Sequence, residues 1–220
     1  MQYAAYVFDA YGTLFDVHAA VRRHADQIGP DGQLLSEIWR AKQLEYSWTL
    51  TLGGHYKDFW TLTEQALDYA LARVPSVDKA LRPKLLDAYF QLDAFPDART
   101  TLRALKDKGH KTGILSNGSP KMLQAAVDAA GIGGDLDAVL SVDALKMFKP
   151  RPEVYTLVTD RFRCRPADVT FVSSNRWDVA AGTSVGFRTF WINRATAPDE
   201  YPDLPPRQVL SELTALMAFA

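Results

Sequence analysis

Five short apolar runs, each bounded by turn-forming residues, constrain the fold of this chain most strongly. Runs of this length are typical of strands that are buried on both faces of a parallel sheet. Helical stretches separate the last four runs, so we expect right-handed crossover connections between neighbouring strands. We therefore predict an α/β fold, a doubly wound parallel sheet (Rossmann-like) of about five strands. The strands are predicted over residues 4–8, 111–115, 138–140, 169–172 and 188–192.

The connecting helices carry their own boundary signals. A helix predicted over 97–108 stops at Gly109, a residue type that is favoured just after a helix C-terminus. Ser119 followed by Pro120 is typical of an N-cap with proline at the first helical position, which predicts a helix through residue 130. Pro152 opens another helix, through residue 162, in the same way. The terminal segment 213–219 predicts an amphipathic helix that docks on the core.

The long segment between the first and second predicted strands does not follow this alternation of strands and helices. It shows no strand signal, and helices are predicted over 19–28, 34–50, 56–71 and 77–92. This is too much chain for one crossover, so we predict that residues 16–95 form a helical bundle inserted as a cap. Residues 1–15 and 96–220 then form the core domain. A larger helical layer within a single domain is the alternative.

Charge and cysteine content exclude several classes of protein. Lys and Arg total 25 and Asp and Glu total 26, with no basic run, so the chain lacks the electrostatic footprint of nucleic-acid binding. The one cysteine, Cys164, excludes an intrachain disulfide and a cysteine-rich zinc site. No charged n-region precedes Arg22, and no apolar run approaches the length of about 18 residues that spans a membrane. We therefore expect a cytoplasmic protein that binds neither nucleic acid nor membrane.

Polar side chains follow four of the predicted strands, where ligands bind in open parallel sheets. A single such residue is often only a turn or cap residue. Four strand ends that converge on one crevice are harder to explain in that way, so we predict a site there. The residues are Asp9 after the first strand, Ser116 and Asn117 after the second, Lys149 in the loop after the third, and Ser173, Ser174, Asn175 and Asp178 after the fourth.

These strand ends resemble the four motifs of the haloacid dehalogenase superfamily. The segments are FDAYGTLF at 8–15, LSNGS at 115–119, KP at 149–150 and VSSNRWD at 172–178. The resemblance covers nearly the whole chain, including a helical insertion after the first motif. Each motif is moderately specific, and the four together are specific.

Two positions distinguish branches of that superfamily. Its phosphatase members resemble Asp-x-Asp-Gly-Thr, in which the second Asp is the general acid and base, whereas Tyr11 stands there in this chain. A phenol with a pKa of about 10 is a poor substitute for a carboxylic acid near neutral pH. Ser173 and Ser174 stand where an acidic pair would help to hold Mg²⁺, a cation that prefers carboxylate oxygens. A halide leaving group needs no proton.

The closer resemblance is therefore to the L-2-haloacid dehalogenases, also at Trp39-Arg40 and at KQLEY, residues 42–46. It implies hydrolysis of (S)-2-haloalkanoic acids to (R)-2-hydroxyalkanoic acids through an aspartyl ester, with inversion at C2. Asp9 would be the nucleophile, and Lys149 would favour its ionised form. Asp178 would be the general base for the hydrolytic water, with Lys149 as the competing organiser of that water. Arg40, in the insertion, would stabilise the departing halide.

The resemblance assigns the remaining site residues supporting roles. Thr13, Ser173 and Asn175 would orient Asp9 or the water, Tyr155 would hydrogen-bond in the site, and Ser116 would hold the substrate carboxylate with the backbone N–H groups after Asp9. Several of the site residues also have a purely structural alternative. The alternatives are a structural hydroxyl at Thr13, core packing at Tyr155 or Phe59, a solvated surface lysine at Lys149, a first-turn helix acid at Asp178 and an exposed helix arginine at Arg40. One departure from close relatives is Ala41, where a polar Gln is expected. The residues predicted to bind substrate are Ala10, Tyr11, Arg40, Phe59, Ser116, Asn117 and Trp177.

The resemblance also implies a homodimer that uses no cofactor and no metal ion, with a 2-haloacid substrate and a halide product. The four histidines show no metal-binding spacing. A Mg²⁺-dependent phosphatase of the same superfamily and a non-catalytic ligand-binding member are the alternatives. The sequence leaves open the preferred halogen and the chain length of the substrate.

Overall fold

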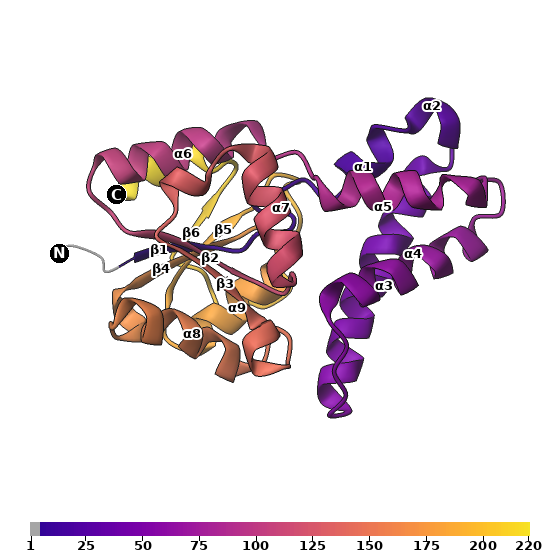
Figure 1. Cartoon of the computed structure of the whole chain (residues 1–220). Coiled ribbons are helices and arrows are strands. Elements are labelled where there is room, and N and C mark those ends of the chain that lie inside the picture. Colours follow the sequence, from indigo (N-terminus) through magenta and orange to yellow (C-terminus); the bar gives the residue numbers. More distant parts are fainter. Residues whose placement is uncertain (1–4) are drawn as a thin grey trace.

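The computed structural model describes residues 5–220, so residue 4 of the first predicted strand lies outside the described part. Six strands form one parallel sheet in the order β3-β2-β1-β4-β5-β6. Helices cover both faces of this sheet, which confirms the predicted doubly wound α/β fold (Figure 1). The strands are β1 (Ala5–Phe8), β2 (Thr112–Ser116), β3 (Ala138–Ser141), β4 (Val169–Ser173), β5 (Arg188–Ile192) and β6 (Gln208–Leu210).

The edge strand β6 is the strand that the sequence analysis missed. It has three residues and pairs with β5 alone, and Gln208 and Val209 are exposed. An exposed strand lacks the continuous apolar run that marks a strand buried on both faces. The five buried strands, in contrast, lie within one residue of their predicted bounds.

The crossover helices begin and end close to the predicted positions. Ser119 occupies the N-cap position before Pro120, although its side chain makes no capping hydrogen bond. The predicted terminal α-helix is a 3₁₀-helix instead, η5 (Thr214–Phe219), and it packs against α6 with Leu213 and Leu216 buried. The crossover helices are α6 (Pro96–Asp107), α7 (Pro120–Ala130), α8 (Pro152–Phe162) and α9 (Arg176–Ser184), and the short 3₁₀-helices are η2 (Gly133–Asp135), η3 (Val142–Leu145) and η4 (Pro166–Asp168).

The insertion is helical, as predicted, and forms a separate lobe beside the sheet (Figure 1). Three predicted helices differ from the structure. The helix predicted over 77–92 is a 3₁₀-helix at Lys79–Leu81 followed by an α-helix at Arg82–Phe90. The segment 19–28 contains two short helices, because His24 N–H bonds back to Val21 O and closes the first one. The helix predicted from residue 56 begins at Phe59, because the Asp58 side chain accepts the N–H groups of the first turn and caps it. The lobe contains α1 (Ala19–Arg22), α2 (Ala25–Ile28), α3 (Gly32–Leu52), α4 (Phe59–Arg73), η1 (Lys79–Leu81) and α5 (Arg82–Phe90).

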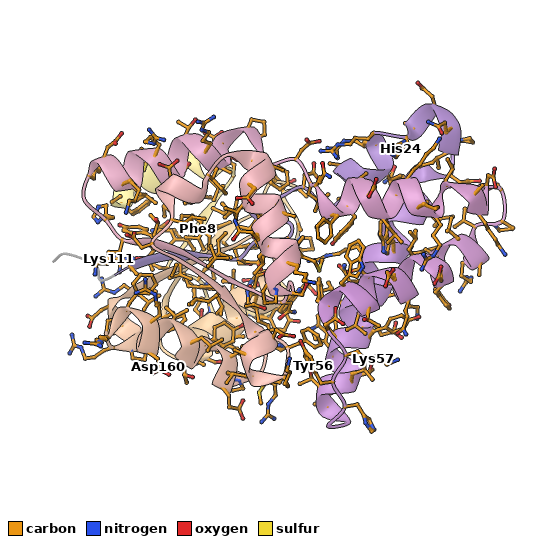
Figure 2. The ribbon with its side chains drawn as sticks, in the orientation of Figure 1. Phe8, His24, Tyr56, Lys57, Lys111 and Asp160 are labelled. Atoms are coloured by element: carbon orange, nitrogen blue, oxygen red, sulfur yellow. The ribbon has the colours of Figure 1, made fainter. Side chains whose placement is uncertain are left out.

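Two chain segments join the helical lobe to the sheet lobe, and they pair with each other. Phe15 and Ala94 form an antiparallel bridge, and Phe95 N–H bonds to Leu14 O at 2.8 Å. A second contact lies further along the boundary, where the Tyr56 hydroxyl donates to Asp143. Figure 2 shows Tyr56 at this boundary and His24 at the top of the helical lobe. The assignment of 16–95 as a separate domain stays a prediction.

Among residues 5–220, none of the helices combines the length and the apolar character needed to cross a bilayer.

Candidate active site

Asp9 follows β1 directly, in the middle of the sheet. Three side chains donate to its carboxylate: Lys149 Nζ to Oδ1 at 3.1 Å, Thr13 Oγ1 to Oδ2 at 2.9 Å and Asn175 Nδ2 to Oδ2 at 2.8 Å. The parallel register explains how they meet, because β1 pairs with β4, and Asn175 follows β4 at the same edge of the sheet. Two lone pairs of Oδ2 are therefore engaged, and Oδ1 keeps one lone pair for other chemistry.

Lys149 lies between two carboxylates and is almost completely buried, at 1% exposure. Its ammonium group donates to Asp9 at 3.1 Å and to Asp178 at 2.8 Å. Burial disfavours the charged amine, but the two carboxylates outweigh burial and raise the pKa of Lys149. Its backbone N–H donates to Asn117 Oδ1 at 2.9 Å, and the Lys149–Pro150 bond is cis.

Asp178 completes this cluster from the first turn of α9. Its Oδ1 accepts the Tyr155 hydroxyl at 2.6 Å and its Oδ2 accepts Lys149. Burial raises the pKa of Asp178 to about 6, and the Lys149 and Tyr155 contacts only partly oppose that shift. A carboxylate of this pKa can accept a proton near neutral pH, as general base catalysis requires.

Thr13 and Asn175 hold the loops around Asp9 as well as Asp9 itself. The Thr13 hydroxyl accepts Ser174 N–H at 2.8 Å, and Asn175 Nδ2 also donates to Tyr11 O at 3.1 Å. These bonds tie the loop after β1 to the loop after β4. The structure thus gives Thr13 both of the roles considered from the sequence, a donor to Asp9 and an acceptor for backbone.

Ser116 and Ser173 end β2 and β4, the two strands that flank β1, and they make the same kind of turn. The Ser116 hydroxyl accepts Gly118 N–H, and the Ser173 hydroxyl accepts Asn175 N–H, both at 3.1 Å and both two residues further on. Such turns satisfy backbone donors at the end of a strand. Both serines are fully buried, and the predicted contact between Ser116 and a substrate carboxylate stays a prediction.

Arg40 reaches the site from α3 of the helical lobe. Its Nη2 donates to Tyr11 O at 3.1 Å and lies 3.4 Å from Asn175 Oδ1, and its Nη1 donates to Gln43 Oε1 at 2.8 Å. Among the described residues, Arg40 forms no ion pair with a carboxylate. Its charge therefore remains available to an anion.

Aromatic rings pack around Tyr11, two residues after Asp9. The rings of Tyr11 and Phe59 lie 6.1 Å apart, and Tyr11 stacks on Tyr89 at 5.9 Å. Burial and the neighbouring Tyr89 raise the pKa of Tyr11 well above its ordinary value, so its phenol stays neutral. Ala10 is fully buried beside this group. Trp177 lies elsewhere, against the edge of Trp48 at 5.5 Å.

Trp177 lines two cavities that also include side chains of the site. One, of about 340 Å³, is lined by Lys149, Pro150, Trp48 and Leu52 among others, and the second, of about 520 Å³, by Arg40, Asn175 and Gly12 among others. Asp9 lines neither of these two cavities and is 5% exposed.

Sequence reasoning missed three residues that lie behind Arg40. Gln43 belongs to the KQLEY segment but had no assigned role, and Thr63 and Tyr89 had no motif signal. The only signal was the spacing of Arg40 and Gln43, which lie three residues apart on α3 and therefore share a face.

Within residues 5–220, His, Cys, Asp and Glu side chains form no group of three or more arranged to hold a metal ion. The predicted absence of a cofactor and of a metal ion stays a prediction.

Known proteins similar to this chain carry the same overall structure. Residues 3–186 match the family of haloacid dehalogenase-like hydrolases. The (S)-2-haloacid dehalogenase 1 of Pseudomonas sp. (strain CBS-3) is 50% identical over 213 residues, which cover 96% of this chain and 94% of that protein. A crystal structure of a dehalogenase superposes with a TM-score of 0.95 at 46% identity and covers 98% of this chain and 96% of the other. The L-2-haloacid dehalogenase from Xanthobacter autotrophicus, solved with chloropropionic acid covalently bound, gives a TM-score of 0.87 at 37% identity, with 99% and 98% covered.

Proposed function

The chain belongs to the (S)-2-haloacid dehalogenases within the haloacid dehalogenase-like hydrolases, and from this premise we propose that it hydrolyses (S)-2-haloalkanoic acids to (R)-2-hydroxyalkanoic acids and halide. The observation that carries the proposal is the Asp9 carboxylate. It is held by Lys149, Thr13 and Asn175 close to Tyr11, which stands where phosphatase members have a carboxylic acid and is a poor substitute for that acid near neutral pH.

In the first step, Asp9 attacks C2 of the substrate from the face opposite the halogen. Oδ1 is the attacking oxygen, because Oδ2 already accepts two hydrogen bonds. A bond forms between Oδ1 and C2, the carbon–halogen bond breaks, and the electron pair of that bond leaves with the halide. The product is an ester of Asp9 with inverted configuration at C2. Lys149 keeps Asp9 ionised for this attack.

In the second step, water cleaves the ester at the carbonyl carbon of Asp9. Asp178 accepts the proton of the water, and its raised pKa of about 6 suits that role near neutral pH. As the acyl C–O bond of the ester breaks, Asp178 returns this proton to the departing alkoxide, so the (R)-2-hydroxy acid leaves with the oxygen that Asp9 contributed. The water oxygen remains in the Asp9 carboxylate, and the second proton of the water is released to solvent. The Tyr155 hydroxyl, at 2.6 Å from Asp178, holds the base in position.

Arg40 supplies the positive charge for the departing halide. It lines the cavity of about 520 Å³, its guanidinium contacts Tyr11 O, and it has no carboxylate partner among the described residues. A cation placed before the reaction stabilises charge that develops in the transition state without reorganisation. The substrate carboxylate binds Ser116 and the backbone N–H groups after Asp9, and Tyr11, Phe59 and Asn117 enclose the rest of the substrate. Trp177 lines the same cavity as Arg40 and contacts the substrate from that side.

The proposed partner state is a homodimer, which rests on the resemblance to the L-2-haloacid dehalogenases. Sedimentation equilibrium should give about twice the 24.5 kDa mass of one chain. A single-chain mass over a hundredfold range of protein concentration would contradict it.

The reaction is tested by measuring halide release from each enantiomer of 2-chloropropionate in the presence of EDTA. We expect chloride from the S enantiomer alone, (R)-lactate as the organic product, and no turnover by Asp9→Asn. Thermal melts of the variant must match those of the parent chain. Phosphate release from a generic phosphoester that requires Mg²⁺, without any chloride, would replace this function with the phosphatase alternative. Tight binding of 2-chloropropionate without turnover would replace it with a binding protein.

A further inference from the structure

A cluster of neutral polar side chains lies behind Arg40 inside the helical lobe. It consists of Gln43 on α3, Thr63 on α4 and Tyr89 on α5, and all three are buried, at 1%, 0% and 3% exposure. We call these three residues the Gln43 cluster. Buried polar groups are costly unless their hydrogen bonds are satisfied, so such a cluster in an apolar bundle needs a reason.

The hydrogen bonds of this cluster allow only one orientation of the Gln43 side-chain amide. Thr63 Oγ1 donates to Phe59 O at 2.7 Å, so its lone pair is left to accept Gln43 Nε2, also at 2.7 Å. With Nε2 committed to Thr63, Gln43 Oε1 faces Arg40 and accepts Nη1 at 2.8 Å. A flipped amide would point N–H groups at a guanidinium that only donates. The orientation of Gln43 is therefore determined by Thr63 on one side and by Arg40 on the other.

Tyr89 closes the cluster and connects it to the catalytic loop. Its hydroxyl lies 3.0 Å from Gln43 Nε2 and 3.1 Å from Gln43 Oε1. Its ring stacks on Tyr11 at 5.9 Å with an interplanar angle of 9°, and it also packs against Trp39 at 4.9 Å. Trp39 is itself fixed by a hydrogen bond from Nε1 to Thr63 O at 2.8 Å. The Gln43 amide, which accepts a hydrogen bond from Arg40, is thus held by contacts from three helices, and Tyr89 links it to the loop after Asp9.

A neutral acceptor is well suited to hold a cation that must meet an anion. A carboxylate at position 43 would fix the guanidinium as firmly, but it would neutralise the charge before a halide arrived. Gln43 fixes one edge of the guanidinium and leaves the formal charge unpaired. Arg40 Nη2 is left to contact Tyr11 O and Asn175, the side that faces Asp9.

We infer that Gln43, Thr63 and Tyr89 are positioning residues that orient Arg40 for the loss of halide and act on that step rather than on hydrolysis of the ester. This inference rests on the proposed function, in which Arg40 stabilises the departing halide. None of the three residues contacts Asp9, Lys149 or Asp178 through a hydrogen bond, so their effect must pass through Arg40 or through the ring of Tyr11.

The test compares two substrates that form the same ester, (S)-2-chloropropionate and (S)-2-bromopropionate. Steps after the irreversible loss of halide do not enter kcat/KM, so a difference between the two values reports substrate binding and halide loss and not hydrolysis of the ester. Chloride is the poorer leaving group and needs more stabilisation. Thr63→Val, which is nearly isosteric, should lower kcat/KM about tenfold for the chloro acid and clearly less for the bromo acid. Thr63→Ser keeps the hydroxyl and should restore the parent values.

Two further variants make the test independent of Thr63. Tyr89→Phe keeps the ring and removes only the hydroxyl, so it should show the same dependence on the halogen with a smaller loss. Gln43→Glu should lose about a hundredfold with the chloro acid, because the guanidinium charge is then neutralised. In an Arg40→Ala background, Thr63→Val should cause no further loss, since the residue that it positions is absent.

Ser47→Ala is the matched control. Ser47 is fully buried on α3, one turn beyond Gln43, and its hydroxyl bonds to Leu44 O without any link to Arg40. It should leave the ratio of the two kcat/KM values unchanged. Equal losses with both halogens in Thr63→Val, or a full additional loss in the Arg40→Ala background, would overturn the inference while the dehalogenase function stands. Absence of halide release from the parent chain would instead remove the proposed function.

Discussion

The sheet lobe and the helical lobe each contribute one cation to the site, and the two cations differ in the charge of their hydrogen-bond partners. In the sheet lobe, Lys149 is fully buried between the carboxylates of Asp9 and Asp178, at 3.1 and 2.8 Å. In the helical lobe, Arg40 is held by the amide oxygen of Gln43 and a backbone carbonyl. Lys149 stabilises charges that are already present, because the carboxylates surround it. Arg40 can stabilise a charge that appears only during the reaction, because none of its described partners is anionic.

Lys149→Met removes the cation of the sheet lobe and should have the largest effect on both stability and activity. It leaves two carboxylates buried without a cation, and loss of one partner of a buried ion pair costs about 3–5 kcal/mol. Urea unfolding should show that loss, and halide release should fall at least a thousandfold, on the order expected when a group acting on the nucleophile is removed. Stability equal to that of the parent chain would show that the two carboxylates do not depend on Lys149.

Arg40→Lys changes the cation of the helical lobe. It should lower activity and leave stability almost unchanged. A single ammonium group cannot span Gln43, Tyr11 O and Asn175 as the guanidinium does, so turnover should fall about a hundredfold. The free energy of unfolding should change by less than about 1 kcal/mol, since no ion pair is lost. Chemical denaturation alongside steady-state kinetics measures both. A stability loss as large as that of Lys149→Met would contradict the contrast between the two cations.

Gly118→Ala tests the stacking of the Tyr11 ring, in the sheet lobe, on the Tyr89 ring, in the helical lobe. A Cβ atom at Gly118 would lie 2.6 Å from Cε2 of the Tyr11 ring, closer than carbon atoms approach. The ring must move, together with its stacking on Tyr89. We expect a stability loss of about 1–3 kcal/mol, as is typical of overpacking, and about a tenfold loss of turnover. Thermal melts and kinetics measure the two effects, and Ser119→Ala, a partly exposed neighbour, serves as the control.

Tyr155→Phe should have the smallest effect, and the effect should appear in the pH profile. The pKa of Asp178 is raised to about 6 by burial, and the Tyr155 hydroxyl opposes that rise by donating to the carboxylate. Removal of the hydroxyl moves the pKa further up, so the acid limb of the kcat profile shifts to higher pH. A shift to lower pH, or no shift with a lower plateau, would exclude Asp178 as the group that this limb reports.

The same pKa has a consequence for stability. The folded-state pKa of Asp178 exceeds its ordinary value of 3.8, so protonation of Asp178 favours the folded state. Its contribution is complete below about pH 4 and is lost as pH rises through about 6. Asp178→Asn should therefore flatten the stability profile between these values while it removes ester hydrolysis. Denaturation midpoints at pH 4, 5, 6 and 7 measure this, and an unchanged profile would contradict the assignment.

The sequence by itself determined the sheet side of the site. Buried parallel strands need short apolar runs, and their ends must meet at one edge, so Asp9, Asn175 and Asp178 were predictable as neighbours. The type of residue at position 11 also needed no coordinates, because a phenol and a carboxylic acid differ in pKa wherever they lie. The exposed strand β6 and the 3₁₀ form of the terminal helix were not predictable in this way, since neither depends on a strong apolar pattern.

Only the tertiary structure decided the helical side. In the sequence Arg40 is marked only by the family resemblance, and its contacts with Tyr11 O and Asn175 depend on how α3 lies against the loops after β1 and β4. Gln43, Thr63 and Tyr89 come from three different helices, and no periodicity relates them. The physical reason is that strand ends are brought together by backbone hydrogen bonding, which any parallel sheet repeats. Side chains of packed helices meet through interhelical geometry, which a single sequence does not encode locally.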